Sequence, residues 1–192
     1  MSTHNVQRAS ERAQHLKLMI FDVDGVLTDG ALRYDAQGEV IKTFHVLDGH
    51  GIKLLQQHGI VVAIISARES SMVARRAADL GIRMLRQGVN DKRAVFEQLL
   101  AELGLTAAQC GYMGDDWVDL PVMLRVGFCA SVPNAHPEVR ARAHWITTSH
   151  GGQGAAREVC DLILRAQGHY EAALAPYLRS EEHTSVLQSR VD

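Results

Sequence analysis

Short apolar runs alternate with longer amphipathic stretches along most of this chain. The apolar runs have the length and composition of buried strands, and they lie at 16–21, 60–66, 81–86, 110–114, 127–132 and 144–147. Apolar residues recur at helical spacing in the stretches at 49–58, 69–80, 91–103, 116–125, 135–142 and 153–167. Strand and helix in alternation predict an α/β fold, a Rossmann-like parallel sheet flanked by helices.

Residues 31–46 depart from this alternation. Two β-rich arms surround the turn sequence Asp35-Ala-Gln-Gly38, which predicts a β-hairpin inserted after the first strand. A single domain is predicted over 16–168, preceded by a polar lead at 1–15 and followed by a tail at 169–192.

The last part of that tail, 179–192, is polar and has no periodicity, so disorder is predicted there. Its sequence also resembles the translation of a common sequencing adapter, and we expect these residues not to belong to the native protein. We assign no function to them.

Composition narrows the class of protein. With 192 residues, 46% hydrophobic and 22% charged, the chain suits one globular domain, and a net charge of -2 without a basic stripe predicts no nucleic-acid partner. Cys110, Cys129 and Cys160 are odd in number and form no CxxC pair, so we expect reduced thiols and neither disulfides nor a zinc cluster. Residues 1–15 lack a secretory signal and no apolar run reaches membrane-spanning length, so we expect a cytoplasmic protein without membrane contact.

The most informative polar motif follows the first apolar run. Asp22 and Asp24 stand at i and i+2 where that strand stops and glycines permit a sharp turn, so both carboxylates can share one cup. A carboxylate and a phosphate about 4 Å apart repel by about 4 kcal/mol at an effective dielectric of about 20, and a magnesium ion would reverse that sign. A polar turn is the plain alternative. A calcium-binding loop is excluded because Leu27 and Arg33 stand where its glycine and glutamate belong.

Three further polar motifs follow later strands. Ser66 can bind a phosphoryl oxygen, or it can cap the next helix as part of a capping box with Glu69. Lys92 follows Asp91, a candidate helix cap, and its positive charge in the first turn opposes the helix dipole. Function often explains such a local conflict, but taken by itself this lysine fits a solvated surface position better.

The last motif is an acidic cluster. Asp115 follows a strand directly, and crowded acids at a strand end favour a cation. Asp116 and Asp119 can do the same or simply stabilise the following helix.

Carboxylate pair, hydroxyl, lysine and acidic group occur in order at four strand ends. This pattern resembles the haloacid dehalogenase superfamily of phosphatases. The stretches DVDGVLTDG, FHVLDGHGIK, ISARES, QGVNDK, GYMGDDWVDLPVM and GGQGAAREVCDLIL, within 16–168, resemble more closely the 3-deoxy-D-manno-octulosonate 8-phosphate phosphatases.

The resemblance implies a mechanism and a site. Asp22 would form an aspartyl-phosphate and Asp24 would act as general acid and base. Mg²⁺ would be held by Asp22, the backbone carbonyl of Asp24 and Asp115. The resemblance further implies that Ser66 and Lys92 bind the phosphoryl group, supported by Asp116 and Asp119.

The resemblance also bears on assembly and substrate. Only the hairpin and one helix fit between Asp24 and Ser66, so the enzyme would be capless and its sites would be completed within a homotetramer. Arg68 and Arg76 would bind the carboxylate of an acidic sugar at an adjoining subunit, or else belong to a solvated helix face. The implied reaction releases phosphate from 3-deoxy-D-manno-octulosonate 8-phosphate in lipopolysaccharide biosynthesis. A nonulosonate 9-phosphate phosphatase and a noncatalytic tetramerisation module are the alternatives.

Overall fold

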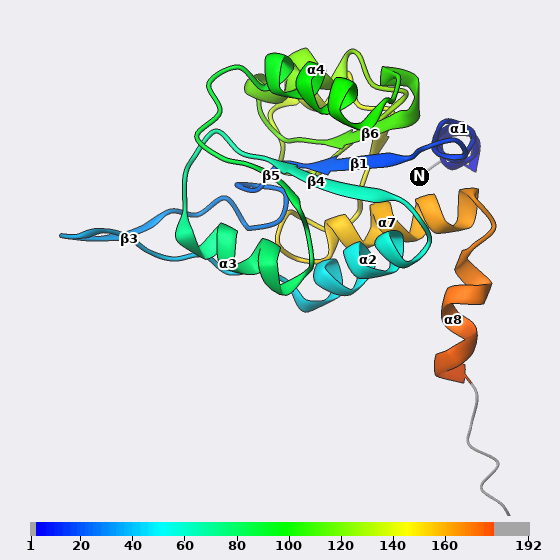
Figure 1. Ribbon diagram of the computed structural model, residues 1–192, viewed down its shortest axis with the longest axis horizontal. Helices are drawn as coiled ribbons and strands as arrows, with labels where there is room; N and C mark the ends of the chain where they lie inside the picture. Colours follow the sequence, from blue (N-terminus) through cyan, green and yellow to red (C-terminus); the bar gives the residue numbers. More distant parts are fainter. Residues whose placement is uncertain (1–2, 179–192) are drawn as a thin grey trace, which may run out of the picture.

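The chain folds around a six-stranded sheet with helices on both faces (Figure 1). The computed structural model describes residues 3–178. Each neighbouring pair of strands is parallel and the order is β5-β4-β1-β6-β7-β8, which confirms the predicted architecture. The strands are β1 (Leu18–Phe21), β4 (Val61–Ile65), β5 (Met84–Arg86), β6 (Cys110–Met113), β7 (Phe128–Ser131) and β8 (Trp145–Ile146).

Helices cover the two faces of the sheet unequally. One face carries α2 (Val46–Gln57), α3 (Ser71–Asp79) and α7 (Ala155–Ala166), and the other carries α4 (Lys92–Leu103) (Figure 1). The remaining short elements are η1 (Ala107–Gln109), η2 (Trp117–Asp119), α5 (Leu120–Met123) and α6 (Pro137–Arg140). The helix predicted at 116–125 is therefore a 3-10 turn followed by one short helix, because Pro121 has no N–H to continue the hydrogen bonding of the turn before it.

Two terminal helices were not predicted as such. Residues of the polar lead form α1 (Thr3–Ala13), where Ala9 and Ala13 are fully buried. Val6, Ala9 and Ala13 have helical spacing, but every other residue of this segment is polar, so its composition led us to interpret it as a polar lead. At the other end α8 (Tyr170–Leu178) extends away from the body of the domain (Figure 1). The predicted disorder of 179–192 falls outside the described residues.

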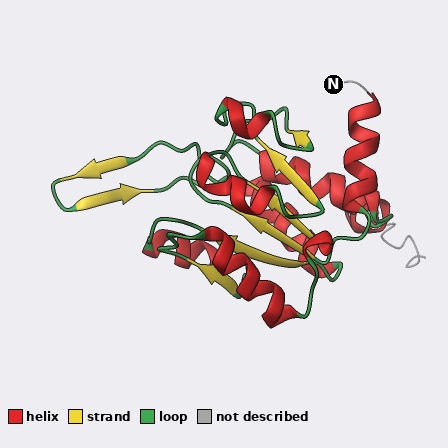
Figure 2. Ribbon diagram, turned by 90° about the horizontal axis from the view of Figure 1, so that it is seen from above, coloured by secondary structure: helices red, strands yellow, loops and turns green. Residues whose placement is uncertain are grey.

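The predicted hairpin is confirmed. Strands β2 (Arg33–Asp35) and β3 (Gly38–Ile41) pair antiparallel and project from the domain (Figure 2). The Asp35 carboxylate accepts hydrogen bonds from the amides of Gln37 (2.8 Å) and Gly38 (3.1 Å), which closes the turn. Between β1 and β4 the chain forms only this hairpin and α2, so the expectation of a capless domain holds.

The core is built around the central strand. All four side chains of β1 are fully buried, as expected for a parallel strand covered on both faces. Phe21 lies opposite Ile64 of β4 and Met113 of β6, so these three strands end side by side. In residues 3–178 no helix combines the length and apolar character that a bilayer span requires.

Candidate active site

The predicted motifs meet at the carboxyl edge of the sheet because the central strands end in register. The Asp22 amide donates to the Met113 carbonyl (3.0 Å), which places Asp22 beside the start of the acidic motif on the neighbouring strand. Ser66 follows β4 directly, and its amide donates to Arg86 (2.9 Å). Ligand sites of open α/β sheets lie at this edge.

Lys92 is drawn into the site by the start of α4. Its ammonium group donates to Asp22 Oδ1 at 2.6 Å and to Asp119 Oδ1 at 2.7 Å, and its side chain is 2% exposed. Asp91 caps α4, as predicted, by accepting from the amides of Arg93 and Ala94. The alternative of a solvated Lys92 is therefore wrong. The two carboxylates outweigh burial and raise the pKa of Lys92, so it stays charged.

Asp119 is the hub of this network and has no exposed surface. Oδ1 accepts from Lys92 and from the Tyr112 hydroxyl at 2.6 Å, while Oδ2 accepts from the amides of Asp115 (3.0 Å) and Asp116 (3.1 Å). Four donors hold this carboxylate, so it orients both Lys92 and the loop that carries Asp115.

Tyr112 was not singled out from the sequence. The one feature of the sequence that could have indicated Tyr112 is a hydroxyl-bearing side chain within the short apolar run CGYMG, which the structure shows to be a buried strand. A buried hydroxyl needs a partner, and here the partner is Asp119.

Asp22, Asp115 and Asp119 each offer a carboxylate oxygen within 4.8 Å of the others. Burial and the neighbouring carboxylates raise the pKa of Asp22 to about 7 and that of Asp115 to about 8. Such crowding of acids favours a hard divalent cation with oxygen ligands. Because both Asp119 oxygens already accept two hydrogen bonds each, Asp22 and Asp115 are the side chains that fit a cation.

Glycines bring the first motif against the acidic loop. A Cβ atom on Gly25, where φ is +93°, would lie 2.0 Å from Asp115 Oδ2. Thr28 fixes the same loop, since its hydroxyl accepts from the Gly30 amide (3.2 Å) and donates to the Val23 carbonyl (3.3 Å).

The late glycine-rich stretch lies on this loop as well. The Gly152 amide donates to the Val26 carbonyl (3.0 Å), and a Cβ atom on Gly151 would lie 1.8 Å from the Gly25 carbonyl oxygen. No chemical role was predicted for GGQG from the sequence, and the structure shows that it supports the backbone of the first motif.

Asp24 turns toward the hairpin. Its Oδ1 pairs with the ammonium group of Lys42, and its Oδ2 lies 3.8 Å from Nε of Arg68. Arg68 also donates to the Tyr34 hydroxyl on β2. Arg68 therefore lies near the first motif of the same chain. Lys42 was missed by sequence analysis because a lysine on a hairpin arm has no distinguishing local pattern.

Ser66 is 2% exposed, and its hydroxyl accepts from the Arg68 amide at 3.3 Å. It does not cap a helix, because α3 begins at Ser71 with Ser70 as its N-cap residue. The capping-box alternative for Ser66 and Glu69 is therefore wrong. Asp116 does act as a cap, accepting from the Trp117 amide at the start of η2 (2.7 Å).

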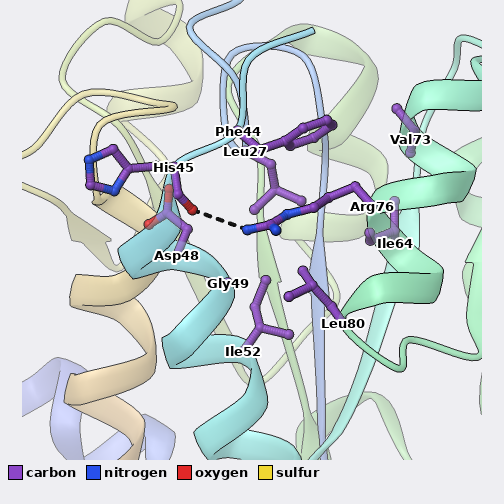
Figure 3. A pocket seen from close by; sticks show the side chains of 10 residues that line it. All are labelled: Leu27, Phe44, His45, Asp48, Gly49, Ile52, Ile64, Val73, Arg76 and Leu80. Atoms are coloured by element: carbon purple, nitrogen blue, oxygen red, sulfur yellow. Dashed lines mark hydrogen bonds between the residues drawn. The ribbon is translucent and has the colours of Figure 1, made fainter.

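Arg76 lies apart from the carboxylate cluster of the same chain. Its guanidinium group donates to the His45 carbonyl at 3.3 Å and lies 5.9 Å from the Phe44 ring centre, in a small pocket between α2 and α3 (Figure 3). Gly49 makes room for it, since a Cβ atom there would meet the guanidinium at 2.3 Å. Its predicted contact with a sugar in an adjoining subunit stays a prediction.

Comparison with known proteins agrees with this geometry. A model of the haloacid dehalogenase-like hydrolase family matches residues 82–159. The 3-deoxy-D-manno-octulosonate 8-phosphate phosphatase of Yersinia pestis is 47% identical over 163 residues, covering 85% of this chain and 87% of that protein. The corresponding protein of Haemophilus influenzae is 46% identical, covering 82% and 88%.

Solved structures are similar over nearly the whole chain. A probable phosphatase of Pseudomonas syringae has a TM-score of 0.89 and 53% identity, covering 91% of this chain and 99% of that one. The 3-deoxy-D-manno-octulosonate 8-phosphate phosphatase of Moraxella catarrhalis, solved with magnesium, phosphate and the sugar acid, has a TM-score of 0.87 and 43% identity, covering 92% and 99%.

Proposed function

Because this chain belongs to the 3-deoxy-D-manno-octulosonate 8-phosphate phosphatases of the haloacid dehalogenase-like hydrolases, we propose that it hydrolyses that sugar phosphate in lipopolysaccharide biosynthesis. The observation that carries the proposal is the buried Asp22–Lys92–Asp119 network beside Asp115, at the edge of the sheet where such folds bind ligands. A phosphate monoester needs this concentration of charge, because its uncatalysed hydrolysis is among the slowest reactions known.

Asp22 is proposed as the nucleophile. A carboxylate oxygen of Asp22 bonds to phosphorus while the bond from phosphorus to the sugar oxygen breaks, and Asp24 gives its proton to that departing oxygen. Water then attacks phosphorus and gives a proton to Asp24, while the bond from phosphorus to the Asp22 oxygen breaks. This step releases inorganic phosphate and restores the Asp22 carboxylate. Lys92 offsets the negative charge that the phosphoryl group brings close to Asp22.

Mg²⁺ is the proposed cofactor, held by the carboxylates of Asp22 and Asp115 and the backbone carbonyl of Asp24. When bound, the cation neutralises charge between the nucleophile and the phosphoryl oxygens. Asp119 positions Lys92 and the Asp115 loop instead of binding the cation, and Asp116 orders the first turn after it.

Substrate recognition is assigned to one hydroxyl and two arginines. Ser66, buried at the end of β4, is proposed to bind a phosphoryl oxygen. Arg68 and Arg76 are proposed to bind the sugar's carboxylate, for which a planar guanidinium is well suited. An arginine at 68 favours the eight-carbon substrate over a nonulosonate 9-phosphate.

Assembly as a homotetramer is part of the proposal. The hairpin exposes apolar side chains that a monomer leaves in water, and these are Leu32, Tyr34, Val40 and Ile41. An unpartnered two-stranded ribbon is only marginally stable alone. Subunits joined through the hairpins would also enclose a site that no cap domain covers. We further propose that the protein acts in the cytoplasm.

The experiment that tests this function is phosphate release from eight-carbon and nine-carbon acidic sugar phosphates, with and without Mg²⁺. Wild type should prefer the eight-carbon substrate, and Arg68→Glu should lower kcat/KM for it by about tenfold or more through loss of a charged contact. Light scattering measures the subunit number in parallel. An intact tetramer that releases no phosphate from any of these sugars would instead favour the noncatalytic module.

A further inference from the structure

Lys42 is a cation whose side chain is covered, although it stands on an otherwise exposed hairpin arm. It follows β3 directly, where Val40 and Ile41 are 47% and 51% exposed, yet its own side chain is only 2% exposed. Lysine is rarely buried unless it is paired. Its partners are the carboxylates of Asp24 and, at 2.9 Å, Glu39.

The lysine remains charged in this position. Burial works against the ammonium form, but the hydrogen bond to Asp24 and the negative charges of Asp24 and Glu39 outweigh it and raise the pKa of Lys42. Glu39 lies on the same arm and balances the charge of Lys42. The hairpin therefore places this charge-balanced lysine against the Asp24 carboxylate.

Contact with Lys42 restricts the Asp24 side chain. The ammonium group occupies Oδ1, while Arg68 lies 3.8 Å from Oδ2 on the other side. A surface aspartate normally samples several rotamers, whereas a carboxylate held at one oxygen presents the other in a fixed direction. Proton transfer depends on such placement, since a displacement of about 1 Å can lower the rate by about 10²-fold.

We propose that Lys42 is a positioning residue that fixes Asp24 for proton transfer to the leaving oxygen of the substrate. The inference rests on the proposed phosphatase function, in which Asp24 is the general acid and base. It gives the hairpin a task in the chemistry of its own subunit, separate from any task in assembly.

Two substrates whose leaving groups differ in basicity distinguish a positioning role of Lys42 from a purely structural one. The value of kcat/KM reports the steps up to release of the first product. p-Nitrophenolate departs without a proton, whereas phenolate is more basic and an alkoxide needs general acid assistance. Phenyl phosphate and p-nitrophenyl phosphate have nearly the same shape, so their ratio is insensitive to losses in folding, assembly, Mg²⁺ binding or phosphate binding.

The expected result is a selective loss. Lys42→Met keeps the apolar stem and should lower kcat/KM about tenfold or more for phenyl phosphate, but less than about threefold for p-nitrophenyl phosphate. The upper bound on the loss is the ~10²–10⁴-fold that a general acid contributes as a whole. Lys42→Arg, which keeps a cation, should recover most of the phenyl phosphate activity. Lys53→Met on the exposed surface of α2 is the matched control and should leave both substrates unchanged.

Equal losses on the two esters, or no loss on either, would overturn the role of Lys42 and leave the phosphatase proposal standing. Recovery by arginine on both esters to the same extent would also count against it, because only folding or binding would then have been restored. If wild type hydrolyses neither the esters nor the sugar phosphate, the proposed function itself fails, and the positioning role fails with it.

Discussion

Replacing Gly25 with alanine tests whether the first motif and the acidic loop form one site. The added Cβ atom would lie 2.0 Å from Asp115 Oδ2, so the carboxylate has to move by about 1.4 Å to reach ordinary van der Waals contact. A misplacement of about 1 Å costs about 10²-fold in rate. We therefore expect Gly25→Ala to lower kcat/KM by about 10²-fold and to weaken Mg²⁺ binding.

Stability also falls, because the alanine must adopt a φ of +93°. Backbone strain of this kind costs about 1–3 kcal/mol, which corresponds to a decrease of about 2–12 °C in Tm for a domain of this size. Thermal unfolding followed by circular dichroism measures this part, and steady-state kinetics with an Mg²⁺ titration measures the first.

Gly59→Ala separates the two effects. Gly59 has a similar φ of +79°, but a Cβ atom there would meet nothing within 4 Å. It should lower Tm by a similar amount while leaving kcat/KM and the Mg²⁺ affinity unchanged. If Gly25→Ala keeps wild-type kinetics and Mg²⁺ affinity, the close approach of Gly25 to Asp115 has no part in the site and our reasoning is refuted.

Three further predictions concern the charges of the site. Asp22→Asn should lower phosphate release by at least about 10³-fold without lowering Tm at about pH 8, since it removes the nucleophile but also a repelling charge; retained activity would exclude Asp22 as nucleophile. Tyr112→Phe should reduce the free energy of unfolding by about 1.5–3 kcal/mol in urea, because Asp119 loses a donor, whereas the exposed Tyr177→Phe should not. The folded state raises the pKa of Asp22 to about 7 and that of Asp115 to about 8 from an ordinary 3.8, so it binds more protons than the unfolded state, and stability without Mg²⁺ falls as pH rises from about 4 to about 8. The rise in Tm on adding Mg²⁺ should therefore be larger at about pH 8 than at about pH 5.5, and a pH-independent rise would contradict this.

Much of the site could be predicted from sequence because of how parallel sheets are built. Strands that run the same way end at the same edge, so motifs that each follow an apolar run converge even when they are far apart in the chain. Lys92 and Asp22 are separated by 70 residues and meet at 2.6 Å for this reason. The partners of each side chain were less predictable. Ser66 matched a capping box that the structure does not use, because α3 starts four residues later than that pattern implies, at Ser71 rather than Ala67.

Contacts made by small or locally unremarkable residues were not predictable. Helix α1 buries Ala9 and Ala13, and a segment with so few large apolar side chains was interpreted as a polar lead. Gly151 and Gly152 matter because their lack of a side chain admits another backbone, which a local pattern cannot reveal. Arg76 was assigned to the substrate from its sequence motif, yet within this chain its guanidinium group donates to the His45 carbonyl beside α2.

The order of apolar runs and polar motifs by itself determined the sheet, the hairpin and the chemical class of the site, since periodicity and strand ends are local properties of a chain. Only the tertiary structure decided which oxygen each donor reaches. In the folded chain Asp119 accepts hydrogen bonds from four donors, one of which is the Tyr112 hydroxyl, and Lys42 of the hairpin pairs with Asp24. Those pairings depend on distances between segments that no spacing along the chain encodes.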